Sequence, residues 1–441
     1  MKITVDLNKP VGKIKDMNSV GQPPISGIGY NAYGAFHYLS DVSVKYSRLH
    51  DIGGAFGGNR YVDVPNIFRD FNADENDPAS YDFVNTDLLI SALVRHGIEP
   101  YYRLGVTIEN NSEVKAYRIF PPADYEKWAR VCEHIIAHYN EGWANGHHYG
   151  IKYWEIWNEP DDECTDTHTS MMWVGTKEEF YNLYGVTAKH LKNRFPDIKI
   201  GGYAAIGFCA INGEPKPLTK EPEKIYQLDF LYGFLDYIKE NDIPLDFFSW
   251  HSYREPARVV EEARWYRECL DSRGFSHVES HLNEWNPVSI NRGGKICPGT
   301  AEHAARVAAT MLGCQNAPVD LLAIYDARFT VGGYAAFFTE LKYPIRPTHA
   351  YYSFAAFASL YNIGTEVKLE RDADGVYALC AYNGNSGAIM IANVSGEKQS
   401  LDISGADLSG ARWHVLDDRR LLSWTPALTD IDDNSVVLIE F

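Results

Sequence analysis

A chain of 441 residues exceeds the size at which a single hydrophobic core stops growing, so we expect one large domain and a smaller one. The composition, 45% hydrophobic and 23% charged, is ordinary for a soluble globular protein. The net charge of −18 disfavours nucleic acid and anionic membranes as partners.

Short apolar runs alternate with helical stretches from about residue 25 to residue 360. Eight predicted strands begin at Ile25, Val44, Ile98, Lys152, Ile198, Asp246, His277 and Val319. Helical periodicity or helix caps predict helices near 88–96, 128–139, 177–184, 230–240, 257–273, 300–312 and 348–361. This alternation predicts a (β/α)8 barrel over residues 21–361. A doubly wound sheet is the alternative, but no glycine-rich phosphate loop follows any predicted strand.

The pattern changes after Tyr361. Short, roughly alternating strands are separated there by Gly, Asn and Asp turns, which predicts a small antiparallel β-sandwich over residues 362–441. The N-terminal run "MKITVDL" is also strand-like. We therefore expect residues 1–20 to supply a strand that packs with the sandwich.

The cysteines and the N-terminal residues indicate in which cellular compartment the protein is expected. The seven cysteines are scattered, without a CxxC pair or the Cys/His spacing of a zinc site, and we expect most of them to be small apolar core residues. The N-terminus has no run apolar enough for a signal peptide, and no stretch could span a bilayer. These features favour a cytoplasmic location, with a signal peptide removed before residue 1 as the alternative. The oligomeric state stays open, a homo-oligomer included.

Two glutamates end predicted barrel strands, and this is where barrel enzymes carry their active sites. The fourth strand ends in "WNEP" with Glu159, and the seventh ends in "LNEW" with Glu284. A lone glutamate after a strand is more often a surface acid, but strands four and seven face each other across the barrel mouth. Glycoside hydrolysis needs two carboxyls that flank one acetal bond. The pair therefore predicts a carbohydrate substrate.

The motifs around these glutamates resemble a known family. "WEIWNEPD" together with "SHLNEW" resembles the retaining barrel glycosidases of clan A and, within them, glycoside hydrolase family 39. That family includes β-xylosidases and α-L-iduronidase. "HHYGIKYWEIWNEP", "LDFFSWHSY" and "RPTHAYYSF" follow in family order. The resemblance implies an exo-acting, retaining hydrolase that uses two glutamates and no cofactor, with a β-xyloside as the first substrate to consider.

The resemblance also implies roles for individual residues. Glu159 would be the acid/base, with a pKa above the ~4.3 of a free glutamate, and Glu284 the nucleophile, with the two carboxyls ~5–5.5 Å apart. Asn158 would bind the sugar 2-hydroxyl. Tyr253 would keep Glu284 ionised through its phenolic proton. His251 would contact sugar hydroxyls.

Further residues at the strand ends could line the pocket. His50 would contact sugar hydroxyls, although a lone buried histidine is usually a core residue. Trp285 is either a packing residue or a platform for a sugar ring. Tyr325 stands where the xylosidases carry a tryptophan, and Asp161 where they usually carry asparagine. These departures leave an α-L-arabinosidase, a β-glucosidase or an iduronidase-like enzyme open.

A metal-dependent enzyme and a non-catalytic binding protein are the alternatives from other functional classes. The acidic run "DDECTDTHTS" over residues 161–170 fits no EF-hand, and the mechanism needs no metal, so we expect a solvated loop and no metal site. A metal-dependent sugar isomerase would need acids and histidines at several strand ends, and the sequence does not assemble such a cluster. A barrel that binds carbohydrate without catalysis is the other alternative, and the presence of both glutamates argues against it.

Overall fold

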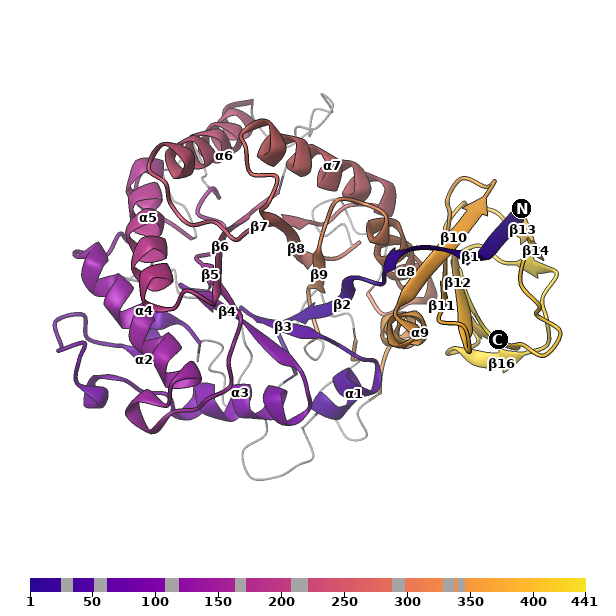
Figure 1. Cartoon of the computed structure of the whole chain (residues 1–441), viewed down its shortest axis with the longest axis horizontal. Coiled ribbons are helices and arrows are strands. Elements are labelled where there is room, and N and C mark those ends of the chain that lie inside the picture. The colour runs from indigo at the N-terminus through magenta and orange to yellow at the C-terminus, as the bar shows by residue number, and fades with distance from the viewer. Residues whose placement is uncertain are drawn as a thin grey trace.

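The structure is a computed structural model of the whole chain, and it describes residues 1–24, 35–50, 62–107, 119–162, 172–207, 221–287, 298–327, 337–338 and 346–441. Eight parallel strands close into a barrel, and helices form a layer around it (Figure 1). The predicted (β/α)8 barrel is confirmed. A smaller lobe of β-structure stands beside α8 and α9 (Figure 1).

The barrel strands lie close to the predicted positions, with one exception. They are β2 (Asp16–Gly21), β3 (Tyr46–Leu49), β4 (Glu99–Leu104), β5 (Tyr153–Ile156), β6 (Lys199–Ala205), β7 (Phe247–Ser252), β8 (Glu279–Trp285) and β9 (Leu321–Ile324). The prediction of the first strand at Ile25 was wrong, because β2 takes that place and residues 25–34 lie outside the described residues. Polar Asn18 and Ser19 are fully buried in β2, so its sequence does not read as an apolar strand.

The helices follow the predicted order. Those in the described ranges are α1 (Phe36–Asp41), α2 (Val64–Ile67), α3 (Val84–Arg95), α4 (Tyr125–Asn140), α5 (Lys177–Arg194), α6 (Glu221–Glu240), α7 (Pro256–Ser272), α8 (Ala301–Gln315) and α9 (His349–Ile363), with short 3-10 turns η2 (Pro78–Ser80) and η4 (Trp143–Asn145). The helix predicted near 177–184 is α5, and it begins with a capping box in which Thr176 and Glu179 exchange side-chain and backbone hydrogen bonds.

The smaller lobe contains the expected antiparallel strands. Its eight-stranded sheet has the order β14-β1-β10-β11-β12-β18-β15-β16, and β13 pairs with β17 in a second sheet. The bounds are β1 (Lys2–Lys13), β10 (Thr365–Arg371), β11 (Val376–Tyr382), β12 (Gly387–Asn393), β13 (Gln399–Ser400), β14 (Asp402–Ser404), β15 (Arg412–Leu416), β16 (Ser423–Thr425), β17 (Asp430–Ile431) and β18 (Ser435–Glu440). The N-terminal strand β1 pairs antiparallel with β10 and parallel with β14. The division into domains at residues 20 and 361 stays a prediction, and β2 begins the barrel within the N-terminal segment.

Both faces of β12, in the middle of the large sheet, are buried. Along β12, Ile389 and Ile391 join the core inside the lobe, whereas Ala388 and Met390 join the core of the barrel. Helices α8 and α9 contact β11, β12 and β18, so they form the seam between lobe and barrel. One hydrophobic core therefore runs from the barrel helices into the sheet.

The barrel interior changes character along its axis. An aromatic layer that includes Tyr46 and Tyr153 fills one level. Two residues further along the same strands, on the same side of each, lie Arg48 and Glu155, both buried. The chain thus places charged groups between the aromatic layer and the carboxyl ends of the strands.

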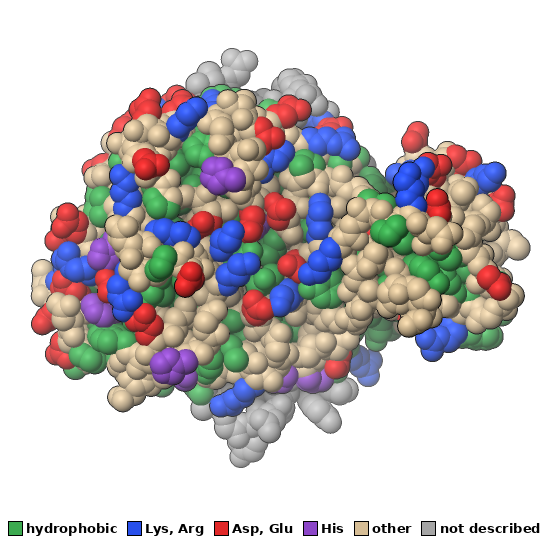
Figure 2. Space-filling view, in the orientation of Figure 1, with side chains coloured by type: hydrophobic (Ala, Val, Ile, Leu, Met, Phe, Trp, Pro, Cys, Tyr) green, Lys and Arg blue, Asp and Glu red, His purple; other side chains and the backbone are tan. Residues whose placement is uncertain are grey.

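The surface mixes both signs of charge. Figure 2 shows acidic and basic side chains interspersed over the face of the molecule seen in Figure 1. Within the described ranges, no helix combines the length and the apolar character needed to cross a bilayer.

Candidate active site

Two carboxylates meet at the carboxyl ends of the barrel strands. Glu159 follows β5 and Glu284 lies near the end of β8. Their side chains are 14% and 9% exposed. One carboxylate oxygen of each lies within 4.8 Å of the other, and His251 Nδ1 lies within the same distance of both. The structure therefore brings the two predicted catalytic residues together.

The segment after β5 is held in an unusual backbone conformation. Trp157 and Glu159 have positive φ values of 74° and 46°. The Trp157 amide donates to Leu104 O at 2.8 Å, and the Glu159 amide donates to Ala204 O at 3.0 Å. The Trp157 indole donates to Met172 O at 2.8 Å. A positive φ in a non-glycine residue persists where its surroundings fix it, and here strands on both sides hold the turn that presents Glu159.

Glu284 is contacted by two hydrogen-bond donors. The Tyr253 hydroxyl donates to Oε1 at 2.5 Å, and Arg48 Nη1 donates to Oε2 at 3.2 Å. Burial raises the pKa of Glu284 above its ordinary value, and the charge of Glu159 adds to this, while Arg48 and Tyr253 oppose the shift. The two donors thus stabilise the ionised form in a buried site that disfavours it.

Arg48 also connects Glu284 to a second buried carboxylate. Its Nε donates to Glu155 Oε2 at 2.8 Å, and its Nη2 donates to Asn158 Oδ1 at 2.6 Å. The other oxygen of Glu155 accepts hydrogen bonds from Ser249 Oγ at 2.6 Å and Asn283 Nδ2 at 2.5 Å. One guanidinium therefore fixes Glu284, the Asn158 amide and Glu155 relative to one another.

The charges in this network stabilise each other. Burial opposes the ionised form of Glu155, yet Arg48 and the hydrogen bonds from Ser249 and Asn283 lower its pKa. Burial likewise opposes the charged form of Arg48, but Glu155 and Glu284 raise its pKa. Sequence reasoning missed Arg48 and Glu155. The signal that could have found them is a single charged residue at an inward position of an apolar barrel strand.

His251 lies against the predicted acid/base. The ring is fully buried, with Nδ1 2.6 Å from Glu159 Oε1 and 3.7 Å from Glu284 Oε2. Burial lowers the pKa of His251 to about 4, so the imidazole is neutral near neutral pH. The Nδ1 atom of His251 thus has the Glu159 carboxyl group as its partner. Contact between His251 and sugar hydroxyls stays a prediction.

The remaining pocket candidates lie at strand ends with little exposure. Tyr325 follows β9, is 8% exposed and contacts Tyr253 edge-on, with ring centroids 6.4 Å apart. Trp285 is 1% exposed, as a packing residue would be, and its role as a sugar platform stays a prediction. His50 directly follows β3 and is 3% exposed. Its contact with sugar also stays a prediction.

The acidic run after Pro160 is described only at its start, because residues 163–171 lie outside the described residues. Asp161 is 1% exposed and accepts a hydrogen bond from the Ile206 amide at 3.2 Å. Burial raises the pKa of Asp161 well above its usual range, and the charge of Glu159 adds to this. Asp161 is therefore part of the buried wall beside Glu159.

The two carboxylates could also be considered as ligands of a metal ion. Contrary to the sequence-based expectation, Glu159, His251 and Glu284 form a cluster of possible ligands at three strand ends. However, Arg48 and Tyr253 donate to both oxygens of Glu284. A guanidinium in hydrogen-bond contact opposes a second cation, so the cluster fits a metal ion poorly.

Comparison with known sequences gives one family. The model of glycosyl hydrolases family 39 matches residues 42–280, just over half of the chain. A β-xylosidase of Geobacillus stearothermophilus is 24% identical over 267 residues, which cover 52% of this chain and 47% of that protein. A β-xylosidase of Caldicellulosiruptor saccharolyticus is 27% identical over 267 residues, covering 57% and 46%. The chain spans about half the length of these curated relatives.

Similar solved structures share the fold over the whole chain. A glucosidase from Croceicoccus marinus matches with a TM-score of 0.75 at 19% identity, covering 100% of this chain and 98% of the other. A monomeric β-xylosidase from Caulobacter crescentus CB15 matches with a TM-score of 0.68 at 15% identity, covering 100% and 99%. At these identities the likeness shows the fold alone. Together with the match of the family model to more than half of the sequence, it leads to one conclusion: the chain belongs to glycosyl hydrolase family 39.

Proposed function

We propose that the protein is a retaining, exo-acting glycoside hydrolase that works by double displacement. The observation that carries this proposal is the close approach of Glu159 and Glu284, whose nearest carboxylate oxygens lie within 4.8 Å. Retaining glycosidases separate their carboxyls by ~5–5.5 Å, whereas inverting enzymes need ~6.5–9.5 Å to admit a water molecule. The short spacing supports direct attack by a carboxylate.

In the first step, Glu284 is the nucleophile. Its ionised carboxylate, hydrogen-bonded by Tyr253 and Arg48, attacks the anomeric carbon. As that bond forms, the glycosidic C–O bond breaks and Glu159 transfers its proton to the departing oxygen. The products of this step are the free aglycone and a glycosyl ester of Glu284.

In the second step, Glu159 acts as a base. Now ionised, it takes a proton from water, and the water oxygen attacks the anomeric carbon and displaces Glu284. His251 Nδ1, 2.6 Å from Glu159, orients this carboxyl through both steps. Asn158 accepts a hydrogen bond from Arg48 through Oδ1, which leaves its amide NH2 group as the donor for the sugar 2-hydroxyl.

The sugar is the finer part of the proposal. Both curated relatives named above are β-xylosidases, which makes a β-xyloside the first candidate. Tyr325 and Asp161 depart from the residues expected in xylosidases, so an α-L-arabinoside, a β-glucoside and an iduronide are the other substrates to compare.

A panel of nitrophenyl glycosides, assayed with and without a chelator, tests the function. We expect one glycoside to be hydrolysed with retention of anomeric configuration, which NMR of the first-formed product measures. We also expect the chelator to leave the rate of hydrolysis unchanged. Inversion would contradict double displacement, and chelator-sensitive turnover would favour a metal-dependent enzyme. Absence of turnover on every glycoside, with sugar binding retained, would favour a non-catalytic carbohydrate-binding barrel.

The variant Glu284→Gln tests the nucleophile, because a neutral amide cannot form the glycosyl ester. We expect kcat to fall at least about a thousandfold with the fold intact. Glu279→Gln is the matched control, since Glu279 lies on the same strand but at its other end, where it pairs with Lys199 and Tyr153. Near wild-type activity in Glu284→Gln would remove this residue from the mechanism.

A further inference from the structure

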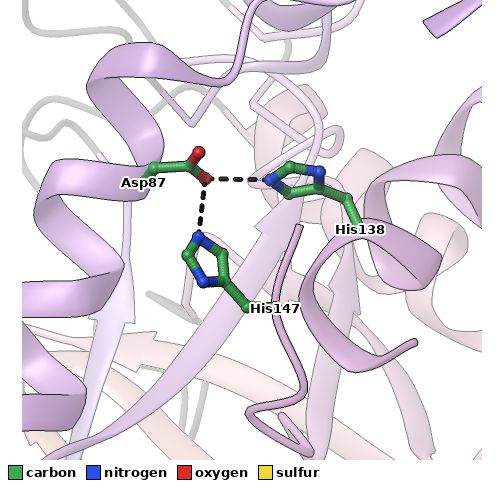
Figure 3. Close-up of side chains that lie close together, drawn as sticks. All are labelled: Asp87, His138 and His147. Atoms are coloured by element: carbon green, nitrogen blue, oxygen red, sulfur yellow. Dashed lines mark hydrogen bonds and ion pairs between the residues drawn. The ribbon is translucent and has the colours of Figure 1, made fainter. Parts of the chain in front are cut away.

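Three possible metal ligands converge in the helical layer outside the barrel. Asp87 lies in the first turn of α3, His138 in the last turn of α4, and His147 two residues after η4. Figure 3 shows both imidazole rings directed at one carboxylate oxygen. Asp87 Oδ1 lies 3.0 Å from His138 Nε2 and 3.6 Å from His147 Nε2. None of these residues takes part in the proposed hydrolysis.

The hydrogen bonding of His138 fixes which of its nitrogens carries a proton. Its Nδ1 lies 2.9 Å from the carbonyl oxygen of Trp143. A carbonyl accepts and cannot donate, so Nδ1 is the protonated nitrogen. In the neutral ring the lone pair of Nε2 then faces the Asp87 carboxylate at 3.0 Å. Two acceptors at this distance need a positive group between them, either a second proton or a metal ion.

His147 favours the metal ion over the proton. Its Nε2 is shielded from solvent and has no hydrogen-bond partner within the part of the chain that the structure describes. At 3.6 Å from Asp87 Oδ1 it is too distant for a hydrogen bond. A proton on His138 leaves this nitrogen unsatisfied, whereas one ion binds all three atoms. Tetrahedral zinc ligands at about 2.0–2.2 Å from the metal lie roughly 3.3 Å from one another, close to the two distances found here.

Aromatic stacking holds both rings in place. The His138 ring stacks on Phe83, with centroids 3.6 Å apart and planes 3° apart. The His147 ring stacks on Tyr149, with centroids 4.5 Å apart and planes 9° apart. The side chains of Asp87 and His147 are 30% and 27% exposed, so the cluster lies near the surface, although Nε2 of His147 is itself covered. Stacking therefore orients both imidazole ligands in advance.

We propose that Asp87, His138 and His147 bind one divalent transition-metal ion of the zinc type, with water completing the coordination. Two imidazole nitrogens and one carboxylate oxygen suit zinc, cobalt or nickel, and not the all-oxygen preference of calcium or magnesium. The Nδ1–H bond of His138 to a backbone carbonyl is the usual outer contact of a metal-bound histidine. The ion ties α3 to the end of α4 and so stabilises the helical layer.

The test uses the full chain without a polyhistidine tag, stripped of metal and titrated with Zn²⁺ by calorimetry, with Co²⁺ absorption as a second readout. His147→Phe keeps an aromatic ring for stacking and removes the ligand nitrogen. His148→Phe is the matched control, because the neighbouring histidine is outside the cluster. We expect one ion per chain in the wild type and in His148→Phe, and at least tenfold weaker binding in His147→Phe and in Asp87→Asn. At a hundredfold excess over Kd, Zn²⁺ should raise Tm by about 3 °C.

Two results would overturn the proposal. One is the absence of saturable binding by the wild-type chain, or binding that His147→Phe leaves unchanged. The other is binding that disappears in Glu284→Gln but persists in His147→Phe, which would assign the ion to the cluster at the barrel mouth. The hydrolysis rate of His147→Phe should equal that of the wild type, so the outcome is independent of the proposed function.

Discussion

Tyr253 and Arg48 each donate a hydrogen bond to one carboxylate oxygen of Glu284. The contribution of the Tyr253 hydroxyl to the pKa of Glu284 can be measured. Burial raises the pKa of Glu284, and the nucleophile acts in its ionised form, so the acidic limb of the kcat/KM profile should lie above the ordinary value for glutamate. Tyr253→Phe removes a hydrogen bond that lowers this pKa. We therefore expect the acidic limb to move to higher pH in this variant.

The matched control is Tyr325→Phe. Tyr325 contacts Tyr253 edge-on, and the substitution leaves the hydrogen bond to Glu284 in place. Its acidic limb should stay where it is in the wild type, whatever happens to KM. If Tyr253→Phe also leaves the limb in place, the phenol does not stabilise the nucleophile.

The role proposed for Glu159 depends on its proton. In Glu159→Ala the basic limb of the pH profile should disappear, because no general acid remains to lose its proton. The loss of rate should be smaller for aryl glycosides whose leaving groups need little protonation. The measurement is the rate of glycosylation across a series of leaving groups. Equal losses across the series would mean that Glu159 is not the acid.

Sequence could identify some of these residues and not others. Glu159 and Glu284 end apolar runs inside recognisable motifs, and Tyr253 directly follows another apolar run, which forms β7. Arg48 and Glu155 were missed because each is a single charge in an apolar run, and their pairing joins strands far apart in sequence. Asp87, His138 and His147 likewise come from separate elements that only the folded helical layer brings together.

At the scale of elements, β3 and β5 are joined through a buried ion pair. Arg48 and Glu155 are 1% and 0% exposed, so removing one partner leaves an unpaired charge in the barrel interior. Arg48→Met should destabilise the protein by about 3–5 kcal/mol, measured as the loss of free energy of unfolding in urea. It should also lower activity, because Asn158 and Glu284 lose a donor.

Lys45→Met is the control for this prediction. Lys45 directly precedes β3 and pairs with Glu99, and the two side chains are 34% and 46% exposed. Such a solvated pair is worth at most about 1 kcal/mol. If Arg48→Met costs no more than Lys45→Met, the barrel interior solvates Glu155 by other means.

The strands were predicted correctly where the buried residues form an apolar run in the sequence. Apolar runs marked β3 to β9, since parallel strands covered on both faces are largely apolar. The strand β2 was missed because its buried positions include Asn18 and Ser19. Helix α6 begins at Glu221, ahead of the predicted start at Phe230, and its second residue, Pro222, is of a type tolerated in the first turn of a helix.

At the scale of the whole molecule, the smaller lobe shares its hydrophobic core with the barrel. Met390 on β12 faces α8 and α9, whereas its neighbour Ile391 faces into the lobe. Alternation in the sequence predicted the strands, but it could not show that the second face of the sheet is covered by barrel helices. The near-continuous apolar run "AIMIA" in β12 was the signal for burial on both faces.

This shared core predicts that lobe and barrel unfold together. Met390 is fully buried, so Met390→Ala should destabilise the protein by about 2–5 kcal/mol. The substitution leaves a cavity at the seam between lobe and barrel. The temperature at which hydrolytic activity is lost should therefore fall together with the midpoint of the unfolding transition measured by circular dichroism. Val11→Ala is the control: Val11 lies on β1 and is 56% exposed, and its loss should change stability by less than about 0.5 kcal/mol. Two separate transitions, with the activity transition unmoved by Met390→Ala, would instead show that the lobe folds as an independent unit and that α8 and α9 keep the barrel stable without it.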